Sequence, residues 1–334
     1  MRRVLCGLAA VAMACGAQTR PAERPAILGI SHIAVYTSDA AKAERFYVHD
    51  LGLEKGDDPE NAQGVRYYVN QEQFIEVLPL PADAGANRLD HIAYITADAE
   101  KMRAYLGAHG VATPDAVKQG PDGSAWFEVK DPEGNRVQFM QPPAALLAEH
   151  DTEALYKLTD ADPIGRRIIH CGMMVRSREK EDTFYRGLLG FEPYWYGGMK
   201  PGKLDWVSQQ VPEGHDWLEY MLIHPSEQNR LAGGPGTSGP SGSAIPAEMS
   251  QKQLGVLNHF SLGVVNMEVA VTTLDAEGRL DNEHVGPQIG RDGKWQYNLF
   301  DPDETRVELM EFSAVEKPCC SEFTAISPTP GTQP

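Results

Sequence analysis

Four of the chain's 10 histidines each open an apolar segment, and each is followed 44 to 49 residues later by a Glu or Gln in the middle of an apolar strand. The histidines are His32, His91, His170 and His259. Their partners, in the same order, are Glu76, Gln138, Glu219 and Glu308. Imidazole and carboxylate groups bind divalent cations such as Zn, Ni, Mn, Co or Fe(II), whereas the lack of cysteine at these positions argues against Cu(I) and iron–sulfur clusters. The strict alternation predicts two metal sites.

The intervals between histidine and partner indicate a structural repeat. The interval is 49 residues in the third and fourth units, 44 in the first and 47 in the second. Near-equal intervals place these residues at equivalent positions of repeated units. A pair of units would then bring two histidines and two acidic or amide side chains together at a shared axis.

The strand around Glu76 explains why a cation is expected there. Side chains alternate between the two faces of a strand, so Phe74, Glu76 and Leu78 share one face. An ionised, unpaired carboxylate on such an apolar face is costly, or its pKa rises strongly. A bound divalent cation removes this cost. Because a lone strand histidine is more often an ordinary core residue, the prediction depends on the repeated constellation.

Two further strings mark the repeat. A string of the form Phe-Tyr-x3-Leu-Gly-x-Glu occurs at residues 46–54 and again at 184–192. An Asp-Pro turn leads into a strand at residues 131–138 and again at 301–308. Asp39 is a helix-start signal after the first histidine segment. Each unit is therefore predicted to contain a strand, a helix and then several strands.

Composition and charge restrict the class of function. The chain has 334 residues, of which 42% are hydrophobic, as in ordinary folded domains. Its 47 acidic and 30 basic residues give a formal charge of −17. Binding to a phosphate backbone depends on clustered Lys and Arg, so no nucleic-acid partner is expected. The apolar run at residues 4–14 is shorter than the ~20 residues that a membrane span needs, so no membrane span is expected.

The first residues predict export to the periplasm or the extracellular space. Arg2 and Arg3, the apolar run and the small residues after it form a secretory signal peptide, which we assign to residues 1–17, followed by a linker at 18–28. Cys15 lies in a sequence that loosely matches a bacterial lipoprotein box. A lipid anchor at Cys15 is therefore an alternative to ordinary cleavage. The oligomeric state is not indicated by the sequence.

The remaining chain divides into two halves of two units each. The first half covers residues 29–141 and the second covers 167–314, with a linker at 142–166 between them. The second half contains a Gly/Pro/Ser-rich insertion at 225–255, and most of this segment has a composition that cannot pack a core.

The C-terminal segment at 315–334 is Pro-rich and is predicted to be an irregular tail. It contains Cys319 and Cys320. Three interpretations are open for this pair: a vicinal disulfide, a soft-metal ligand, or two inert thiols, of which the last is the expectation.

From Gly29 to Phe312 the chain resembles the vicinal oxygen chelate superfamily, whose members include glyoxalase I, extradiol ring-cleaving dioxygenases, methylmalonyl-CoA epimerase and fosfomycin-resistance proteins. The resemblance implies an α+β fold in which four βαβββ modules form two paired-module, cupped-sheet, glyoxalase-like domains. It implies a complete metal-ligand set in the second half: His170, Glu219, His259 and Glu308. The candidate second metal site, in the first half, has one Gln in place of Glu: His32, Glu76, His91 and Gln138.

The resemblance also implies metal-dependent chemistry on a small-molecule substrate with two neighbouring oxygens. A glyoxalase-like lyase or isomerase is expected, with Glu308 as the candidate base and Glu219 as its counterpart across the metal. Thiol cofactors such as glutathione belong mainly to the cytosol, so an exported protein is not expected to be glyoxalase I itself.

Two other functions remain open. An Fe(II)-dependent extradiol dioxygenase would use His170, His259 and Glu308 as its iron triad. Against it, a carboxylate at Glu219 is not expected beside that triad, and the family's acid–base histidine is missing before the last strand, with His224 and His284 as the nearest substitutes. A non-catalytic small-molecule-binding protein is the third possibility, and the complete ligand quartet argues against it.

Overall fold

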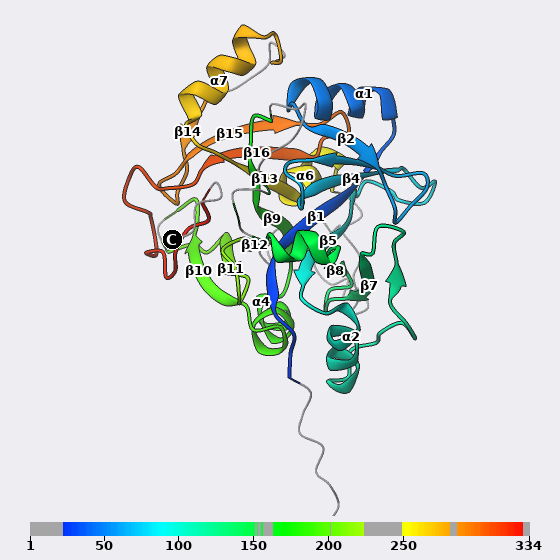
Figure 1. Cartoon of the computed structure of the whole chain (residues 1–334). Helices are drawn as coiled ribbons and strands as arrows, with labels where there is room; N and C mark the ends of the chain where they lie inside the picture. The colour runs from blue at the N-terminus through cyan, green and yellow to red at the C-terminus, as the bar shows by residue number, and fades with distance from the viewer. Residues whose placement is uncertain are drawn as a thin grey trace, which may run out of the picture.

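The structure is a computed structural model that describes residues 23–150, 152, 155, 163–200, 202–223, 249–280 and 286–329. Two eight-stranded sheets organise these residues (Figure 1). The strands of the first sheet are β1 (Ile27–Thr37), β2 (Glu54–Asp57), β3 (Val65–Tyr68), β4 (Phe74–Pro79), β5 (Leu89–Thr96), β6 (Lys118–Gln119), β7 (Ala125–Lys130) and β8 (Arg136–Gln141). Those of the second are β9 (Arg167–Val175), β10 (Glu192–Gly197), β11 (Trp206–Gln210), β12 (Trp217–Leu222), β13 (His259–Val264), β14 (Gln288–Ile289), β15 (Trp295–Phe300) and β16 (Arg306–Glu311).

The two sheets have the same topology. Their strand orders are β2-β3-β4-β1-β5-β8-β7-β6 and β10-β11-β12-β9-β13-β16-β15-β14. The central pair, β1 with β5 or β9 with β13, is antiparallel, and each central strand is parallel to the last strand of its own unit. This arrangement confirms the predicted α+β fold of four βαβββ modules forming two paired-module domains.

Each module has its helical segment after its first strand. These segments are α1 (Ala40–Glu44) continued by the π-helical turn η1 (Arg45–Asp50), α2 (Ala99–Ala108), α4 (Arg178–Asp182) continued by η3 (Thr183–Leu188), and α7 (Met267–Ala276). The side chains of Asp39, Asp98 and Asn266 cap three of these helices by accepting a hydrogen bond from a first-turn backbone N–H. The helix start predicted at Asp39 is thus confirmed.

The Asp-Pro turn of each half lies against the first helix of the other half. Asp301 accepts a hydrogen bond from the Tyr47 hydroxyl at 2.9 Å, and Asp303 accepts one from Thr37 Oγ1 at 2.8 Å. In the opposite direction, Glu133 accepts hydrogen bonds from the backbone N–H of Arg176 and Ser177. The two Asp-Pro turns therefore form hydrogen bonds that link the two halves.

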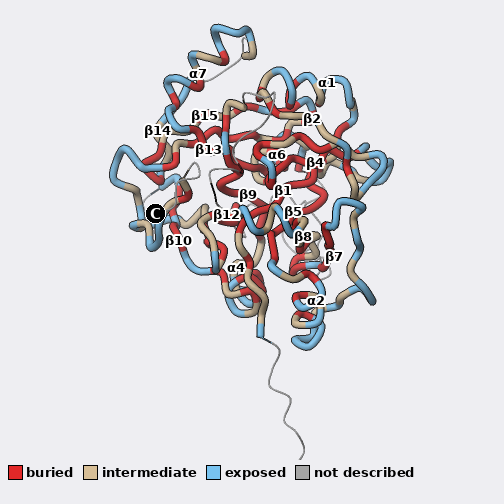
Figure 2. The backbone as a smooth tube through the Cα atoms, viewed as in Figure 1, coloured by how far each residue is buried: buried red, intermediate tan, exposed pale blue. Residues whose placement is uncertain are grey.

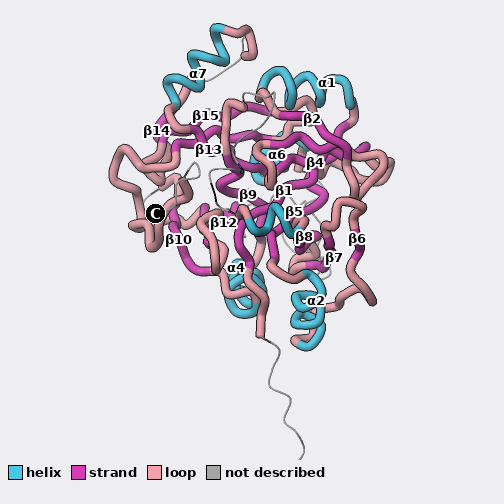
Figure 3. Tube along the Cα trace, in the orientation of Figure 1, coloured by secondary structure: helices cyan, strands magenta, loops and turns pink. Residues whose placement is uncertain are grey.

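The core runs through the strands of both halves. Figure 2 shows the buried backbone concentrated at the centre, and Figure 3 shows that this centre consists mainly of strands, with α1, α2, α4 and α7 at the periphery. One hydrophobic cluster contains residues from both sheets, including Ile33, Tyr94, Leu218 and Leu309. Strands β1 and β9 lie near each other at the junction, where Gln73 hydrogen-bonds to the backbone of Ile168. The two halves are therefore parts of one packed structure.

The two connecting segments contain short helices. Residues 224–248, which make up most of the insertion expected at 225–255, lie outside the described part of the chain, and Gln251–Leu257 form helix α6. A capping box between Ser250 and Gln253 starts this helix, because the low-complexity composition has ended by then. In the linker, Ala144–Ala148 form the short helix α3.

The tail has neither helix nor strand in its described part, and it packs on β10. Tyr196 N donates to Ser321 Oγ at 3.0 Å, and Thr324 N donates to the carbonyl of Tyr194 at 3.0 Å. Cys319 and Cys320 form a vicinal disulfide, so the expectation of two inert thiols is wrong.

The segments expected to direct export lie at the other end of the chain. The signal peptide, Cys15 and most of the 18–28 linker fall outside the described residues. Among the residues that are described, no helix is long and apolar enough to cross a membrane.

Candidate metal centres

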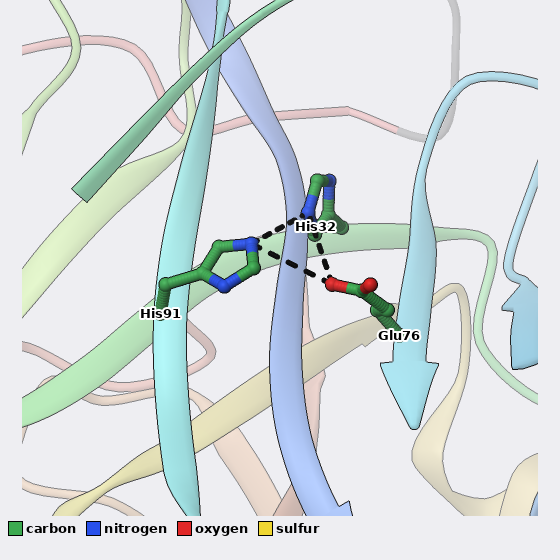
Figure 4. Close-up of side chains that lie close together, drawn as sticks. All are labelled: His32, Glu76 and His91. Carbon is green, nitrogen blue, oxygen red and sulfur yellow. Dashed lines mark hydrogen bonds and ion pairs between the residues drawn. The ribbon is translucent and has the colours of Figure 1, made fainter. Parts of the chain in front are cut away.

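The first site brings together His32 on β1, Glu76 on β4 and His91 on β5 (Figure 4). The two Nε2 atoms are 3.0 Å apart, and Glu76 Oε2 lies 3.8 Å from His32 Nε2 and 3.6 Å from His91 Nε2. Because β1 lies between β4 and β5, the three side chains project from neighbouring strands to one point. All three residues are buried.

Gln138, the fourth residue predicted for this site, lies beside the histidines but has another partner. Its Nε2 is 3.5 Å from His32 Nε2 and donates to Glu60 Oε2 at 2.7 Å. Glu60 belongs to the β2–β3 connection, and it also accepts a hydrogen bond from Arg66 at 2.6 Å. The sequence contained no signal for Glu60, because a loop glutamate without strand periodicity looks like a solvated surface residue.

Burial dominates the electrostatics of the first site. It lowers the pKa of His32 well below the ordinary value, with further contributions from His91 and Arg66. It raises the pKa of Glu76 to about 10, and Glu76 Oε2 has no hydrogen-bond partner among the described residues. Asp90 holds His91 Nδ1 at 2.7 Å, which leaves Nε2 facing the other two groups. The lowered pKa of His32 and a buried carboxylate oxygen without a hydrogen-bond partner suit a cation.

The second site brings together His170 on β9, His259 on β13 and Glu308 on β16. His170 Nε2 lies 3.1 Å from His259 Nε2 and 3.2 Å from Glu308 Oε2. The fourth residue, Glu219 on β12, has its Oε2 3.5 Å from His259 Nε2. All four residues predicted for this site therefore face one another. Glu219 lies at the edge of the group, with 14% of its side chain exposed.

The two carboxyl groups of the second site differ in their tendency to ionise. Burial and the negative charge of Glu308 raise the pKa of Glu219 to about 8. Burial also acts to raise the pKa of Glu308, but the hydrogen bond with His170 and the positive charge of Arg306 bring it below its ordinary value. Burial lowers the pKa of both histidines. The Glu308 carboxyl is thus ionised at neutral pH, whereas Glu219 retains its proton.

Both groups of side chains fit a divalent cation. Metal–nitrogen and metal–oxygen bonds of about 2.0–2.2 Å place neighbouring ligand atoms roughly 3.0–3.5 Å apart. In the second site the three distances between histidine Nε2 atoms and carboxylate oxygens, or between the two Nε2 atoms, are 3.1, 3.2 and 3.5 Å. In the first site the corresponding distances are 3.0, 3.6 and 3.8 Å. An aromatic ring on the neighbouring strand also positions the first histidine of each pair: Phe74 stacks on His32 and Trp217 lies against His170.

The cavities beside the two sites differ in character. The second has a volume of about 260 Å³ and five aromatic residues in its lining: Tyr194, Trp195, Trp206, Trp217 and Phe323. Phe323 comes from the C-terminal tail, a contribution that the sequence did not indicate. The first has a volume of about 460 Å³ and a largely polar lining that includes Glu60, Asp90, Lys118, Glu128 and Arg136. His224 and His284, considered as acid–base substitutes, lie outside the described residues.

Comparison with known proteins agrees with this geometry. Residues 29–139 match the model of the Glyoxalase/Bleomycin resistance protein/Dioxygenase superfamily. No curated protein sequence matches the chain.

Solved structures with a similar fold include ring-cleaving dioxygenases. A variant of homoprotocatechuate 2,3-dioxygenase from Brevibacterium fuscum is 18% identical, with a TM-score of 0.59 over 86% of this chain and 72% of that one. The 2,3-dioxygenase LapB from Pseudomonas sp. KL28 is 14% identical, with a TM-score of 0.58 over 93% and 97% of the two chains. A catechol 2,3-dioxygenase, at 14% identity, has a TM-score of 0.57 over 92% and 96%. At these identities the similarity concerns the fold.

The family match covers the first half of the chain, and the second half repeats the strand order of the first and contains a second group of two histidines and a carboxylate. Residues 29–139 thus match the Glyoxalase/Bleomycin resistance protein/Dioxygenase superfamily, and both halves of the chain have the same paired-module fold.

Proposed function

We propose that the chain is a metal-dependent enzyme and that its reaction takes place at the second site, as a glyoxalase-like lyase or isomerase. The observation that carries this proposal is the pair of unequal carboxyl groups, Glu219 and Glu308, beside one histidine pair and an aromatic cavity. An ionised ligand and a separate group that can take up a proton are what proton transfer at a metal-bound substrate requires. The substrate would be a small molecule with two neighbouring oxygens.

The geometry favours Glu219 over Glu308 as the base, which reverses the preference stated from the sequence. Glu308 is engaged with His170 at 3.2 Å, whereas Glu219 makes the longer contact and is the more exposed of the two. Once a bound cation has displaced the proton that its raised pKa of about 8 retains in the metal-free protein, Glu219 could accept a proton from carbon. A divalent cation bound here would orient the two substrate oxygens and stabilise the negative charge that develops on them.

An Fe(II)-dependent extradiol dioxygenase is the second candidate. It is favoured by the fold shared with three ring-cleaving dioxygenases and by the grouping of His170, His259 and Glu308 as two histidines and one carboxylate. Glu219 beside this triad speaks against it. So does the cavity lining, which contains no histidine among the described residues. A non-catalytic binding protein is the third candidate. The two groups of histidine and carboxylate side chains argue against it.

We further propose that the first site binds a metal for structural purposes. Charged residues of its cavity wall already have partners, since Arg136 pairs with Asp90 and Glu128, and Glu60 pairs with Arg66 behind the wall. Few of these charges are left to recognise a substrate. We also propose that the protein is exported, with or without a lipid anchor at Cys15. The Cys319–Cys320 disulfide supports this, since disulfides persist in oxidising compartments.

Metal analysis and oxygen dependence test the proposal. Protein purified without chelators should contain metal at the second site, and His259→Ala should remove it while His91→Ala leaves it in place. Undiminished metal in His259→Ala would contradict the second site. A substrate screen should then be run with and without oxygen. Turnover that persists anaerobically supports a lyase or isomerase, whereas catechol-dependent oxygen uptake after Fe(II) loading would establish the dioxygenase instead.

A further inference from the structure

Each half has an arginine at the same position of its last strand, but the partners of this arginine differ between the halves. Arg136 and Arg306 each begin the last strand of their half, two residues before Gln138 and Glu308. Arg136 is neutralised, because its guanidinium pairs with Asp90 and with Glu128, the latter with Nε at 2.9 Å.

Arg306 lacks the equivalent partners. The position of Glu128 is taken by Asn298. In the strand register Asn298 lies opposite Glu308, as Glu128 lies opposite Gln138. The position of Asp90, directly before the second histidine, is taken by Asn258. Asn258 is occupied elsewhere, since its amide donates to Asn87 Oδ1 and accepts from Met174 N, both at 2.9 Å.

The result is an arginine without an ion pair in the described part of the chain. Nε of Arg306 and Oδ1 of Asn298 are both buried and have no hydrogen-bond partner there. Both residues line the aromatic cavity of the second site. A buried guanidinium donor without an acceptor is costly, so an acceptor from a ligand is the natural complement.

The charge balance of the two cavities agrees with this difference. Charged residues of the first cavity comprise four carboxylates and two cations: Glu60, Glu76, Asp90, Glu128, Lys118 and Arg136. Those of the second comprise three carboxylates and two cations: Glu219, Asp292, Glu308, Arg291 and Arg306. With one divalent cation in each, the first cavity is balanced and the second keeps a positive charge. The buried ammonium of Lys294, 4.7 Å from the Trp217 ring, adds to that charge.

We propose that Arg306 determines the specificity of the second site by binding an anionic group of the substrate, a carboxylate on a small organic molecule. The guanidinium would donate to the carboxylate oxygens, while the aromatic walls contact the hydrocarbon part. The inference builds on the proposed function by naming a substrate class for the same site. It concerns binding, and its test does not depend on turnover.

Equilibrium dialysis with radiolabelled benzoate and its uncharged analogue benzamide tests the inference on the full chain, both metal-loaded and chelator-treated. Benzoate should bind at least about 10-fold more tightly than benzamide, the difference of a charge-assisted pair in a desolvated site. Arg306→Gln should remove this preference with and without metal. Arg136→Gln is the matched control, and it should leave benzoate binding at the second cavity unchanged.

A second variant retains the arginine and supplies the partner that it lacks. Asn298→Glu should pair with Arg306 as Glu128 pairs with Arg136 and should abolish the preference for benzoate. Circular dichroism melts would establish that each variant is folded. Equal affinity of the wild-type protein for both probes, or an unchanged preference in Arg306→Gln, overturns the inference. An Arg306-dependent preference in protein whose second site takes up no metal would preserve the inference and overturn the metal chemistry.

Discussion

The imidazole of His259 lies directly over the α-carbon of Gly172, its partner on the antiparallel strand β9. A Cβ atom at Gly172 would lie 2.0 Å from Cε1 and 2.8 Å from Nε2 of that ring. The position equivalent to Gly172 in the first half is Ala34, which pairs with His91. The second site therefore depends on a glycine to keep its histidine in place.

Substitution of this glycine should damage the second metal site selectively. Gly172→Ala pushes the His259 ring away from His170, and a displacement of a ligand typically weakens metal binding by about 10- to 100-fold. Metal titration followed by elemental analysis would measure the loss. The matched control, Ala34→Gly, opens space beside His91 and should retain metal at both sites. A Gly172→Ala protein with wild-type affinity would mean that His259 is not a ligand.

The two carboxyl groups of the second site should respond differently to conversion to the amide. Glu308→Gln removes the ionised group next to His170 and should reduce metal affinity. Glu219→Gln should leave the metal bound and lower kcat by about 10²- to 10⁴-fold, the usual contribution of a general base. Metal content and kcat measured side by side would separate these roles. Equal kcat in Glu219→Gln and the wild-type protein would exclude Glu219 as the base.

The stabilisation by metal should increase with pH. Without metal, Glu219 has a pKa of about 8 in the folded protein, raised from its ordinary value of 4.5, so it holds a proton that the unfolded chain has lost. The stability of the metal-free protein therefore falls as the pH rises through this window. A bound cation displaces the proton of Glu219 and so removes this loss of stability. The shift of the melting temperature by Ni²⁺ should be larger at pH 8 than at pH 6.

Glu219→Gln provides the control for this pH dependence. The amide does not titrate, so the melting temperature of the metal-free variant should change less between pH 6 and pH 8. Glu76, whose pKa is raised from 4.5 to about 10, should add the same kind of stability loss across that whole range, so the variant keeps part of the pH dependence. A wild-type melting temperature that responds to Ni²⁺ equally at both pH values would contradict the assignment of Glu219 as a protonated group.

Lys294 should reduce the stability of the protein. Its side chain is fully buried, with its ammonium within 5.8 Å of the rings of Tyr194, Trp217 and Phe323. Burial lowers its pKa from 10.5 to about 8, an effect that Asp292 and Glu308 only partly offset. The cost of the buried charge is present in full below pH 8 and disappears as the pH rises towards 10.5.

Lys294→Met should therefore raise the free energy of unfolding at pH 7 by about 1–3 kcal/mol. This is the free energy equivalent to the pKa shift, reduced by the energy of the cation–π contacts that the substitution removes. Denaturant unfolding at pH 7 and pH 10 would measure the change, and the gain should shrink at the higher pH. The equivalent residue in the first half is Ser124, in a hairpin with the same backbone hydrogen bonds. Ser124→Ala serves as the control without a pH-dependent gain. Destabilisation by Lys294→Met at pH 7 would indicate that the ammonium has a favourable partner.

The fold and the residues of both sites could be predicted from the sequence because they are repeated. A single strand histidine carries little information, but His170 and His259 occur with the same interval to an acidic partner. Repetition of such an interval requires a repeated path of the chain, and the modules provide it. The irregular features had no such support. Helix α6 follows a low-complexity segment, and Glu60 lies in a loop, so neither produced a pattern that could be recognised.

The modules, their pairing and the eight residues around which the two sites are built could be inferred from the sequence, because periodicity and intervals are properties of the chain. The differences among these residues became visible in the folded structure. It paired Gln138 with Glu60, gave Glu219 and Glu308 opposite tendencies to ionise, and left Arg306 without the carboxylates that neutralise Arg136. These differences arise from burial and from neighbours distant in sequence. Intervals along the chain do not encode them.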